Sequence, residues 1–228
     1  MNLKKLPLTV DAVVIDLDGT LLHTAPDIAK AANRMLAELQ LPPVPAEVVA
    51  TYIGKGGARL IKRLLTGSMD GEPDAELFKR AQHIHEGHYA ELVCDSQPFP
   101  DVVEGLEVMK QAGYRLACIT NKSEKFTIPL LKDAGLFDYF ELVLSGDSLP
   151  RCKPDPLPLL HACEKFGTTP ERMLLIGDSL NDSEAARAAG CHFFCVPYGY
   201  NQGQPVHELE PDAIVDSLLD ATALIRRA

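Results

Sequence analysis

The chain of 228 residues is 46% hydrophobic and 24% charged, a composition that excludes general disorder and allows one large domain or a domain with a smaller insertion. Its 32 acidic residues outnumber its 22 basic residues, and the net charge of -10 argues against non-specific binding to a nucleic-acid backbone, although not against a local basic pocket for a small anion. No apolar run reaches the roughly 18 residues of a membrane span, so we expect neither nucleic acid nor a membrane among the partners.

The N-terminal stretch and the cysteines indicate the cellular compartment in which we expect the protein. Asp11, Asp16 and Asp18 interrupt the apolar run near the N-terminus, and no small-residue cleavage site follows it, so this stretch does not resemble a signal peptide. The six cysteines are scattered and include no CxxC pair, which indicates neither a zinc site nor a redox motif. We therefore expect a reduced, cytoplasmic protein, and no pattern in the sequence indicates its oligomeric state.

The first predicted element is a strand over Val10–Asp18, where a nearly continuous run of apolar and β-branched residues is typical of a parallel strand buried on both faces. The interval from Leu22 to Pro98 has no convincing strand. It contains three helical patterns, at Ala25–Leu39, Ala46–Thr66 and Asp74–Val93. We expect residues 22–98 to form a helical cap domain, inserted into a domain made of residues 1–21 and 99–228, with hinges near Leu22 and Pro98.

The rest of the chain alternates between strands and helices. Strands are predicted at Tyr114–Thr120, Glu141–Ser145, Met173–Gly177 and His192–Pro197. Helices are predicted at Val102–Ala112, Glu124–Ala134, Leu157–Phe166 and Asp182–Ala189. Each helix is followed by a glycine, the residue that a left-handed C-cap favours, at Gly113, Gly135, Gly167 and Gly190. This alternation predicts an α/β fold with a doubly wound parallel sheet.

Two carboxylates stand at the end of the first predicted strand. Asp16 and Asp18 are two positions apart, so they point to the same side of an extended chain, and Gly19 then permits a sharp turn. Two close carboxylates repel each other unless a cation lies between them, and Mg²⁺ prefers such oxygen ligands. The alternative is an ordinary acidic junction between a strand and a turn.

Further polar residues follow three later segments. Asp178 directly follows Met173–Gly177, and because parallel strands end at one edge of the sheet, we expect it to face Asp16. Asp182, four residues later, could instead be a helix N-cap, and the same alternative applies to the pair Thr120-Asn121. Lys153 precedes a proline-rich helix start, where it could bind an anion or simply be a solvated surface charge.

These motifs together resemble the haloacid dehalogenase superfamily over essentially the whole chain. The segment from Asp16 to Thr20 (DLDGT) is similar to its first motif, Thr120 to its second, Lys153 to its third, and Gly177-Asp178 with Asp182 to its fourth, in the same order and at similar spacing. The resemblance implies a Rossmann-like core with a helical cap.

The resemblance also implies a phosphatase that uses Mg²⁺. Asp16 would attack phosphorus and form an aspartyl-phosphate, and Asp18 would act as general acid and then as general base. The Asp16 carboxylate, the Asp18 main-chain carbonyl and Asp178 would hold the metal. Dehalogenases of the superfamily lack the aspartate at the position of Asp18, so its presence argues for phosphoryl transfer.

Three other residues would bind the phosphoryl oxygens and one would orient the metal's water molecules. The phosphoryl group would be bound by Thr120, the backbone near Asn121, and Lys153, while Asp182 would hold the water molecules on the metal.

The predicted cap contains a glycine-rich interruption at Tyr52–Arg59 (YIGKGGAR). It is either a helix break with solvated Lys55 and Arg59, or a loop that brings backbone amides and Lys55 over the active site. This loop and the segment Asp16–Asp27 resemble those of phosphoglycolate phosphatases, which implies 2-phosphoglycolate as the substrate. Lys55 would then bind the substrate carboxylate, with Arg59 as a second cation. His23 stands where many relatives have an aspartate, and we expect it to be a hinge contact.

Three alternatives remain open at this point. A phosphatase acting broadly on sugar phosphates or nucleotides would carry the same motifs, and a β-phosphoglucomutase-like enzyme would use the same aspartate pair but return the phosphoryl group to a sugar. From a different class, a phospho-accepting signalling module also places Asp, Thr and Lys around Mg²⁺. Such modules are shorter and lack the helical insertion.

Overall fold

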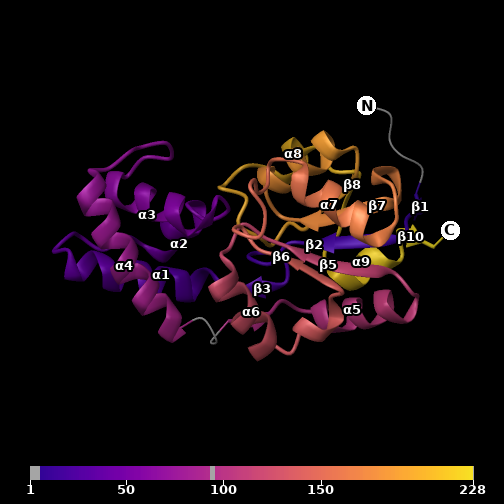
Figure 1. Ribbon diagram of the computed structural model, residues 1–228, viewed down its shortest axis with the longest axis horizontal. Helices are drawn as coiled ribbons and strands as arrows, with labels where there is room; N and C mark the ends of the chain where they lie inside the picture. Colours follow the sequence, from indigo (N-terminus) through magenta and orange to yellow (C-terminus); the bar gives the residue numbers. More distant parts are fainter. Residues whose placement is uncertain (1–5, 93–95, 228) are drawn as a thin grey trace.

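The computed structural model describes residues 6–92 and 96–227, and its centre is a six-stranded sheet in which all strands are parallel (Figure 1). In spatial order the strands are β6 (Leu142–Leu144), β5 (Arg115–Ile119), β2 (Ala12–Ile15), β7 (Met173–Gly177), β8 (His192–Cys195) and β9 (Ala213–Ile214). Ile15 of β2 lies opposite Cys118 on one side and Ile176 on the other, so the three central strands end at the same edge.

Helices cover both faces of this sheet, which confirms the predicted fold class. Val13 and Ile15 of β2 pack toward α5 (Val102–Gln111), α6 (Glu124–Asp133) and α9 (Leu218–Thr222). Ala12 and Val14 point to the opposite face, toward α7 (Leu157–Phe166) and α8 (Leu180–Ala189). Because both faces are covered, all four residues of β2 are fully buried, which explains its lack of polar alternation.

Four helices lie together beside the sheet, on the left in Figure 1: α1 (Ala25–Glu38), α2 (Ala46–Thr51), α3 (Gly56–Thr66) and α4 (Ala75–Leu92). The pattern predicted as one helix over Ala46–Thr66 is two helices, because the chain takes positive φ angles at Gly54, between them, and at Gly56, the first residue of α3. The predicted end of the last helix at Val93 lies outside the described residues.

The two points at which the chain passes between the sheet and these helices lie side by side. Leu22–His23 forms β3, which pairs antiparallel with β4 at Gln97–Pro98. The expectation of no strand between Leu22 and Pro98 was therefore wrong, because strands of two residues are too short to leave a hydrophobic period. The division of the chain at residues 22 and 98 stays a prediction.

His23 lies at this strand pair. Its Nδ1 atom is 2.9 Å from the hydroxyl of Tyr200, and its ring lies 5.3 Å from that of Phe99. The same tyrosine hydroxyl accepts a hydrogen bond of 3.0 Å from the backbone N–H of Ala25, at the start of α1. His23 is thus a contact between the strand pair and the loop after β8, and its role at a hinge stays a prediction.

The remaining elements are short. A second two-stranded pair, which is parallel, joins β1 (Leu8–Thr9) near the start of the described chain to β10 (Ile225–Arg226) near its end. The loops of the described residues also contain the 3-10 turns η2 (Phe137–Tyr139), η3 (Pro170–Arg172) and η4 (Val206–Leu209). None of the cysteines in the described ranges forms a disulfide bond, and Cys94 lies outside those ranges. None of the helices described is long and apolar enough to cross a membrane.

Candidate active site

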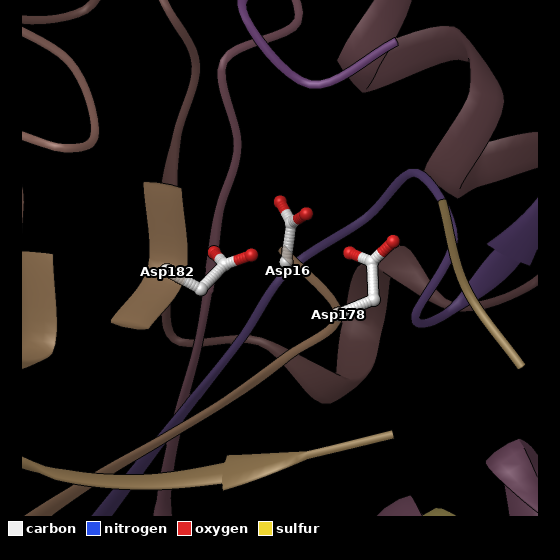
Figure 2. Close-up of side chains that lie close together, drawn as sticks. All are labelled: Asp16, Asp178 and Asp182. Carbon is white, nitrogen blue, oxygen red and sulfur yellow. The ribbon is translucent and has the colours of Figure 1, made fainter. Parts of the chain in front are cut away.

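Three carboxyl groups meet at the edge where the central strands end. Asp16 follows β2, Asp178 follows β7, and Asp182 lies in the first turn of α8. Each offers an oxygen atom, these atoms lie within 4.8 Å of one another, and all three residues are buried (Figure 2). The parallel register, which aligns the ends of β2 and β7, brings Asp178 beside Asp16.

The loop after Asp18 is shaped by its approach to Asp178. Gly19 has a φ of +87°, and a side chain there would collide with the Asp178 carboxyl group, so only glycine fits. Thr20 donates a hydrogen bond of 3.3 Å from its hydroxyl to Asp178 Oδ1, and the backbone N–H of Tyr200 donates to Asp178 Oδ2. The two loops thereby hold Asp178 in place.

Lys153 is the cation of this cluster. Its Nζ donates to Asp16 Oδ1 at 2.8 Å and to Asp182 Oδ1 at 2.6 Å, and its side chain is only 2% exposed. The other Asp182 oxygen accepts from the backbone N–H and the hydroxyl of Ser179, at 3.1 and 2.6 Å. Lys153 is therefore not a solvated surface charge. Ser179 is the N-cap of α8, and Asp182, in the first turn, completes the capping box and binds Lys153.

Asp18 lies in a second ion pair, with a lysine that the sequence analysis missed. Lys122 Nζ is 2.8 Å from Asp18 Oδ1 and 2.9 Å from Oδ2. The backbone N–H of Lys122 donates to the hydroxyl of buried Thr120 at 3.2 Å. The available signal was its position directly after Thr120-Asn121, at the same sheet edge, but a single lysine usually lies in solvent.

Asn121 joins the glycine-rich loop of the predicted cap to the segment that carries Lys153. Its amide donates to the carbonyl oxygens of Gly54 and Lys153, at 2.9 and 2.8 Å. The structure places the two cap cations differently. Lys55 is exposed and lines the cavity described below, whereas Arg59 pairs with Glu72 at 3.1 Å and is not brought to the site.

Burial dominates the electrostatics of the carboxyl cluster. It raises the pKa of Asp16 to about 7, with Asp182 adding to the rise and Lys153 opposing it. It likewise raises the pKa of Asp178 well above its usual range, and neighbouring Asp16 adds to this. When Asp16, Asp18, Asp178 and Asp182 are all ionised, the two ammonium groups that pair with them in the described ranges, those of Lys122 and Lys153, leave two negative charges without a counter-ion. This donor set and charge fit one divalent cation such as Mg²⁺.

A cavity of about 500 Å³ lies over the cluster, between the sheet edge and the helices of residues 25–92. Its lining includes Asp16, Asp18 and Asp178 from the sheet edge, and His85 and Tyr89 from α4. This volume is in the range of small-molecule sites, so the carboxylates are accessible to a compact ligand.

Comparisons with known proteins agree with this architecture. The haloacid dehalogenase-like hydrolase family matches residues 10–190. The chain is 61% identical to a phosphoglycolate phosphatase of Thiobacillus denitrificans, over 99% of this chain and 100% of the relative, and 59% identical to one of Nitrosospira multiformis, over 97% and 98%.

A solved structure shares the whole fold as well. A crystal structure described as a predicted phosphoglycolate phosphatase from Haemophilus somnus superposes with a TM-score of 0.89 and 37% identity, over 93% of this chain and 96% of that one. Together with the motif residues gathered at the sheet edge, these matches establish that the chain belongs to the haloacid dehalogenase-like hydrolases, in the branch of the phosphoglycolate phosphatases.

Proposed function

We propose that the protein hydrolyses 2-phosphoglycolate to glycolate and phosphate through an aspartyl-phosphate intermediate on Asp16. The observation that carries this proposal is the buried Asp16 carboxyl group, which lines the cavity with Lys153 at 2.8 Å and Asp178 beside it. The substrate is supported by the two relatives that share 61% and 59% identity over nearly their whole length.

The reaction proceeds in two displacements at phosphorus. An oxygen of the Asp16 carboxylate attacks phosphorus, the bond to the ester oxygen breaks, and that oxygen leaves as glycolate with a proton from Asp18, which enters this step in its protonated form. Asp18 then takes a proton from a water molecule, whose oxygen attacks the phosphoryl group and breaks its bond to Asp16. Phosphate is released and both aspartates return to their starting states.

The phosphoryl group carries negative charge, so its binding requires positive charge and hydrogen-bond donors. Lys153, the Thr120 hydroxyl and the backbone at Asn121 would bind its oxygens. The Asp16 carboxylate, the Asp18 main-chain carbonyl and Asp178 would hold Mg²⁺. The metal would offset the repulsion between the anionic nucleophile and the anionic phosphate. Lys55, exposed in the cavity lining, stays a candidate for attracting the anionic substrate.

A substrate panel with Mg²⁺ tests this function. We expect kcat/KM for 2-phosphoglycolate to exceed that for sugar phosphates and nucleoside monophosphates by about tenfold or more. Comparable values across the panel would favour the broad phosphatase. Turnover of a sugar phosphate only with a bisphosphate activator would favour the phosphoglucomutase-like transfer.

The Asp16→Asn variant tests the chemistry. An amide is a far weaker nucleophile than a carboxylate, so activity should fall below about a thousandth of wild type, and mass spectrometry after an acid quench should detect no phosphoenzyme. Asp138→Asn, on the exposed 3-10 turn η2, is the matched control and should keep full activity. Substantial turnover by Asp16→Asn would remove Asp16 from its assigned role.

A further inference from the structure

Helix α4 presents two polar aromatic side chains to the cavity. His85 and Tyr89 are four residues apart, so they lie on one face of the helix, and their rings stack at 5.9 Å with an interplanar angle of 18°. Both residues are almost wholly buried, with 4% and 3% of their surface exposed. The ring of Phe126, from α6, packs edge-on against Tyr89 at 5.0 Å and fixes its orientation.

Both side chains have an unused polar atom. His85 Nε2 and Tyr89 Oη make no hydrogen bond to any residue in the described ranges, although both atoms are buried. Burying a polar group without a partner is unfavourable, and native proteins seldom tolerate it unless a ligand or water completes the bond. Burial lowers the pKa of His85 to about 4 and raises the pKa of Tyr89, so near pH 7 both groups are neutral.

Lys122 supplies a positive charge next to this pair. Its ammonium group lies 5.0 Å from the centre of the Tyr89 ring while it binds Asp18. This part of the cavity therefore has a cation and two neutral groups with hydrogen-bonding capacity, directly beside Asp18, the residue assigned as general acid and then general base. Lys55, the cation predicted from the sequence, is exposed and belongs to the loop before α3.

The chemistry of the substrate connects these groups to Asp18. In 2-phosphoglycolate a single methylene group separates the ester oxygen from the carboxylate. If Asp18 protonates the ester oxygen, the carboxylate must lie within a few bond lengths of Asp18, where Lys122 is the cation in contact. A carboxylate accepts several hydrogen bonds at once, and bonds to a charged acceptor are stronger than neutral ones.

We propose that His85, Tyr89 and Lys122 form the subsite that binds the carboxylate of the leaving group, and so select phosphoglycolate among small phosphate esters. This inference rests on the proposed function and names the residues that determine its specificity. Lys55 then acts at the exposed edge of the cavity, and His85 and Tyr89 of α4 determine the preference for 2-phosphoglycolate.

The test compares two substrates that differ only in the leaving group. For each variant, kcat/KM is measured for 2-phosphoglycolate and for 2-hydroxyethyl phosphate, in which a hydroxymethyl group replaces the carboxylate. Tyr89→Phe removes one oxygen atom and His85→Phe removes the ring nitrogens, while both retain the aromatic stacking. Each should reduce the ratio of the two kcat/KM values by about tenfold or more, which is the usual effect of losing one hydrogen bond to a charged group.

Two matched variants test whether losing a tyrosine hydroxyl or a histidine ring elsewhere in the protein changes the ratio of the two kcat/KM values. Tyr139→Phe removes the same atom from a tyrosine on η2, and His83→Phe alters an exposed histidine of the same helix α4; both should leave the ratio as in wild type. Lys55→Ala should change the ratio less than Tyr89→Phe does. Circular dichroism establishes that each variant folds, and if His85→Phe does not, Tyr89→Phe alone decides the test.

The possible outcomes test the proposed subsite and the proposed function separately. A wild-type enzyme that prefers 2-phosphoglycolate, with an unchanged ratio in Tyr89→Phe and His85→Phe, would overturn the subsite and leave the proposed function intact. An equal loss on both esters would also overturn it, because it would indicate closure or folding instead of carboxylate binding. A wild-type enzyme without preference for 2-phosphoglycolate would overturn the proposed function and this inference together.

Discussion

At the scale of single residues, the ion pair between Asp18 and Lys122 links the chemistry to the walls of the cavity. Both side chains are mostly buried, with 14% and 7% of their surface exposed. Burial by itself would lower the pKa of Lys122, but the Asp18 carboxylate more than compensates, so the net pKa is raised and the lysine stays charged. A buried charge that loses its partner is strongly unfavourable, so each member of the pair depends on the other.

Replacing Lys122 by methionine should therefore impair catalysis on every ester. The change keeps the length and the apolar stem of the side chain but leaves Asp18 without its cation, so kcat should fall by about 10²-fold, the lower end of what acid-base catalysis contributes. Steady-state kinetics with 2-phosphoglycolate and 2-hydroxyethyl phosphate measure the loss. Lys125→Met, at a neighbouring lysine that pairs with Glu86 and is 51% exposed, is the control. A kcat within threefold of wild type for Lys122→Met would contradict the role given to the pair.

Most of the motif residues at the site could be found from the sequence because each follows a strand whose apolar run is unmistakable. Asp16 and Asp178 are examples, since the parallel register brings the ends of β2 and β7 together. Lys122, His85 and Tyr89 could not be found in this way. Their environment depends on how α4 packs over the sheet edge, and neither their spacing nor their residue type differs from that of an ordinary helix or surface lysine.

At the scale of elements, regular segments were predictable and the short ones were not. The helices at Leu157–Phe166 and Glu124–Asp133 agree with their predicted patterns to within one residue, because a hydrophobic period and a terminal glycine mark them. The strands β3 and β4 have two residues each, which is too few for a period. They form because the first and last cap helices, α1 and α4, pack against each other and bring the two crossing points together.

The loop after β8 connects this strand pair to the carboxyl cluster through Tyr200. The backbone N–H of Tyr200 donates to Asp178, while its hydroxyl accepts from the Ala25 N–H and lies 2.9 Å from His23. One residue thus contacts a proposed metal ligand, the start of α1 and β3. No pattern in the sequence singles out this tyrosine, because its partners are 22 or more residues away along the chain.

Tyr200→Phe should destabilise the protein without changing its shape. The substitution removes the acceptor of the buried Ala25 N–H and the partner of His23, and an unsatisfied buried donor costs about 1–3 kcal/mol. For a chain of this size we expect the midpoint of thermal unfolding to fall by about 2–10 °C. Differential scanning calorimetry measures it, with Tyr139→Phe as the control for a half-exposed tyrosine. A midpoint unchanged within error would show that these contacts contribute no net stability.

At the scale of the whole molecule, one hydrophobic cluster extends from a face of the sheet into the four helices beside it. It includes Val13 and Ile15 of β2 as well as Met35 of α1 and Ile61 of α3. The helices therefore share a continuous core with the sheet, and they form the far wall of the cavity over Asp16 and Asp178. The burial that positions the nucleophile also raises its pKa, so site electrostatics and global stability are linked.

This linkage has a definite sign in the metal-free protein. Between pH 4 and 7 the folded protein keeps a proton on Asp16, whose pKa is raised to about 7, while the unfolded chain has released it near the ordinary value of 3.8. The folded state thus binds more protons, and the free energy of unfolding contributed by this group falls as pH rises, by up to about 4 kcal/mol over the window. A divalent cation bound by the deprotonated carboxylates removes this penalty.

Mg²⁺ should therefore stabilise the protein more at high pH than at low pH. At pH 5 protons compete with the metal for Asp16 and Asp178, whereas at pH 8 the carboxylates are free to bind it. We expect the rise in Tm between EDTA and millimolar Mg²⁺ to be small at pH 5 and to grow through pH 7 to pH 8. Taking this difference at each pH cancels the contributions of the other titrating groups, which the metal does not touch. Asp178→Asn should abolish most of the rise at pH 8, and Asp138→Asn should keep it. The same rise at pH 5 and pH 8, or a full rise in Asp178→Asn, would place metal binding elsewhere than at this cluster.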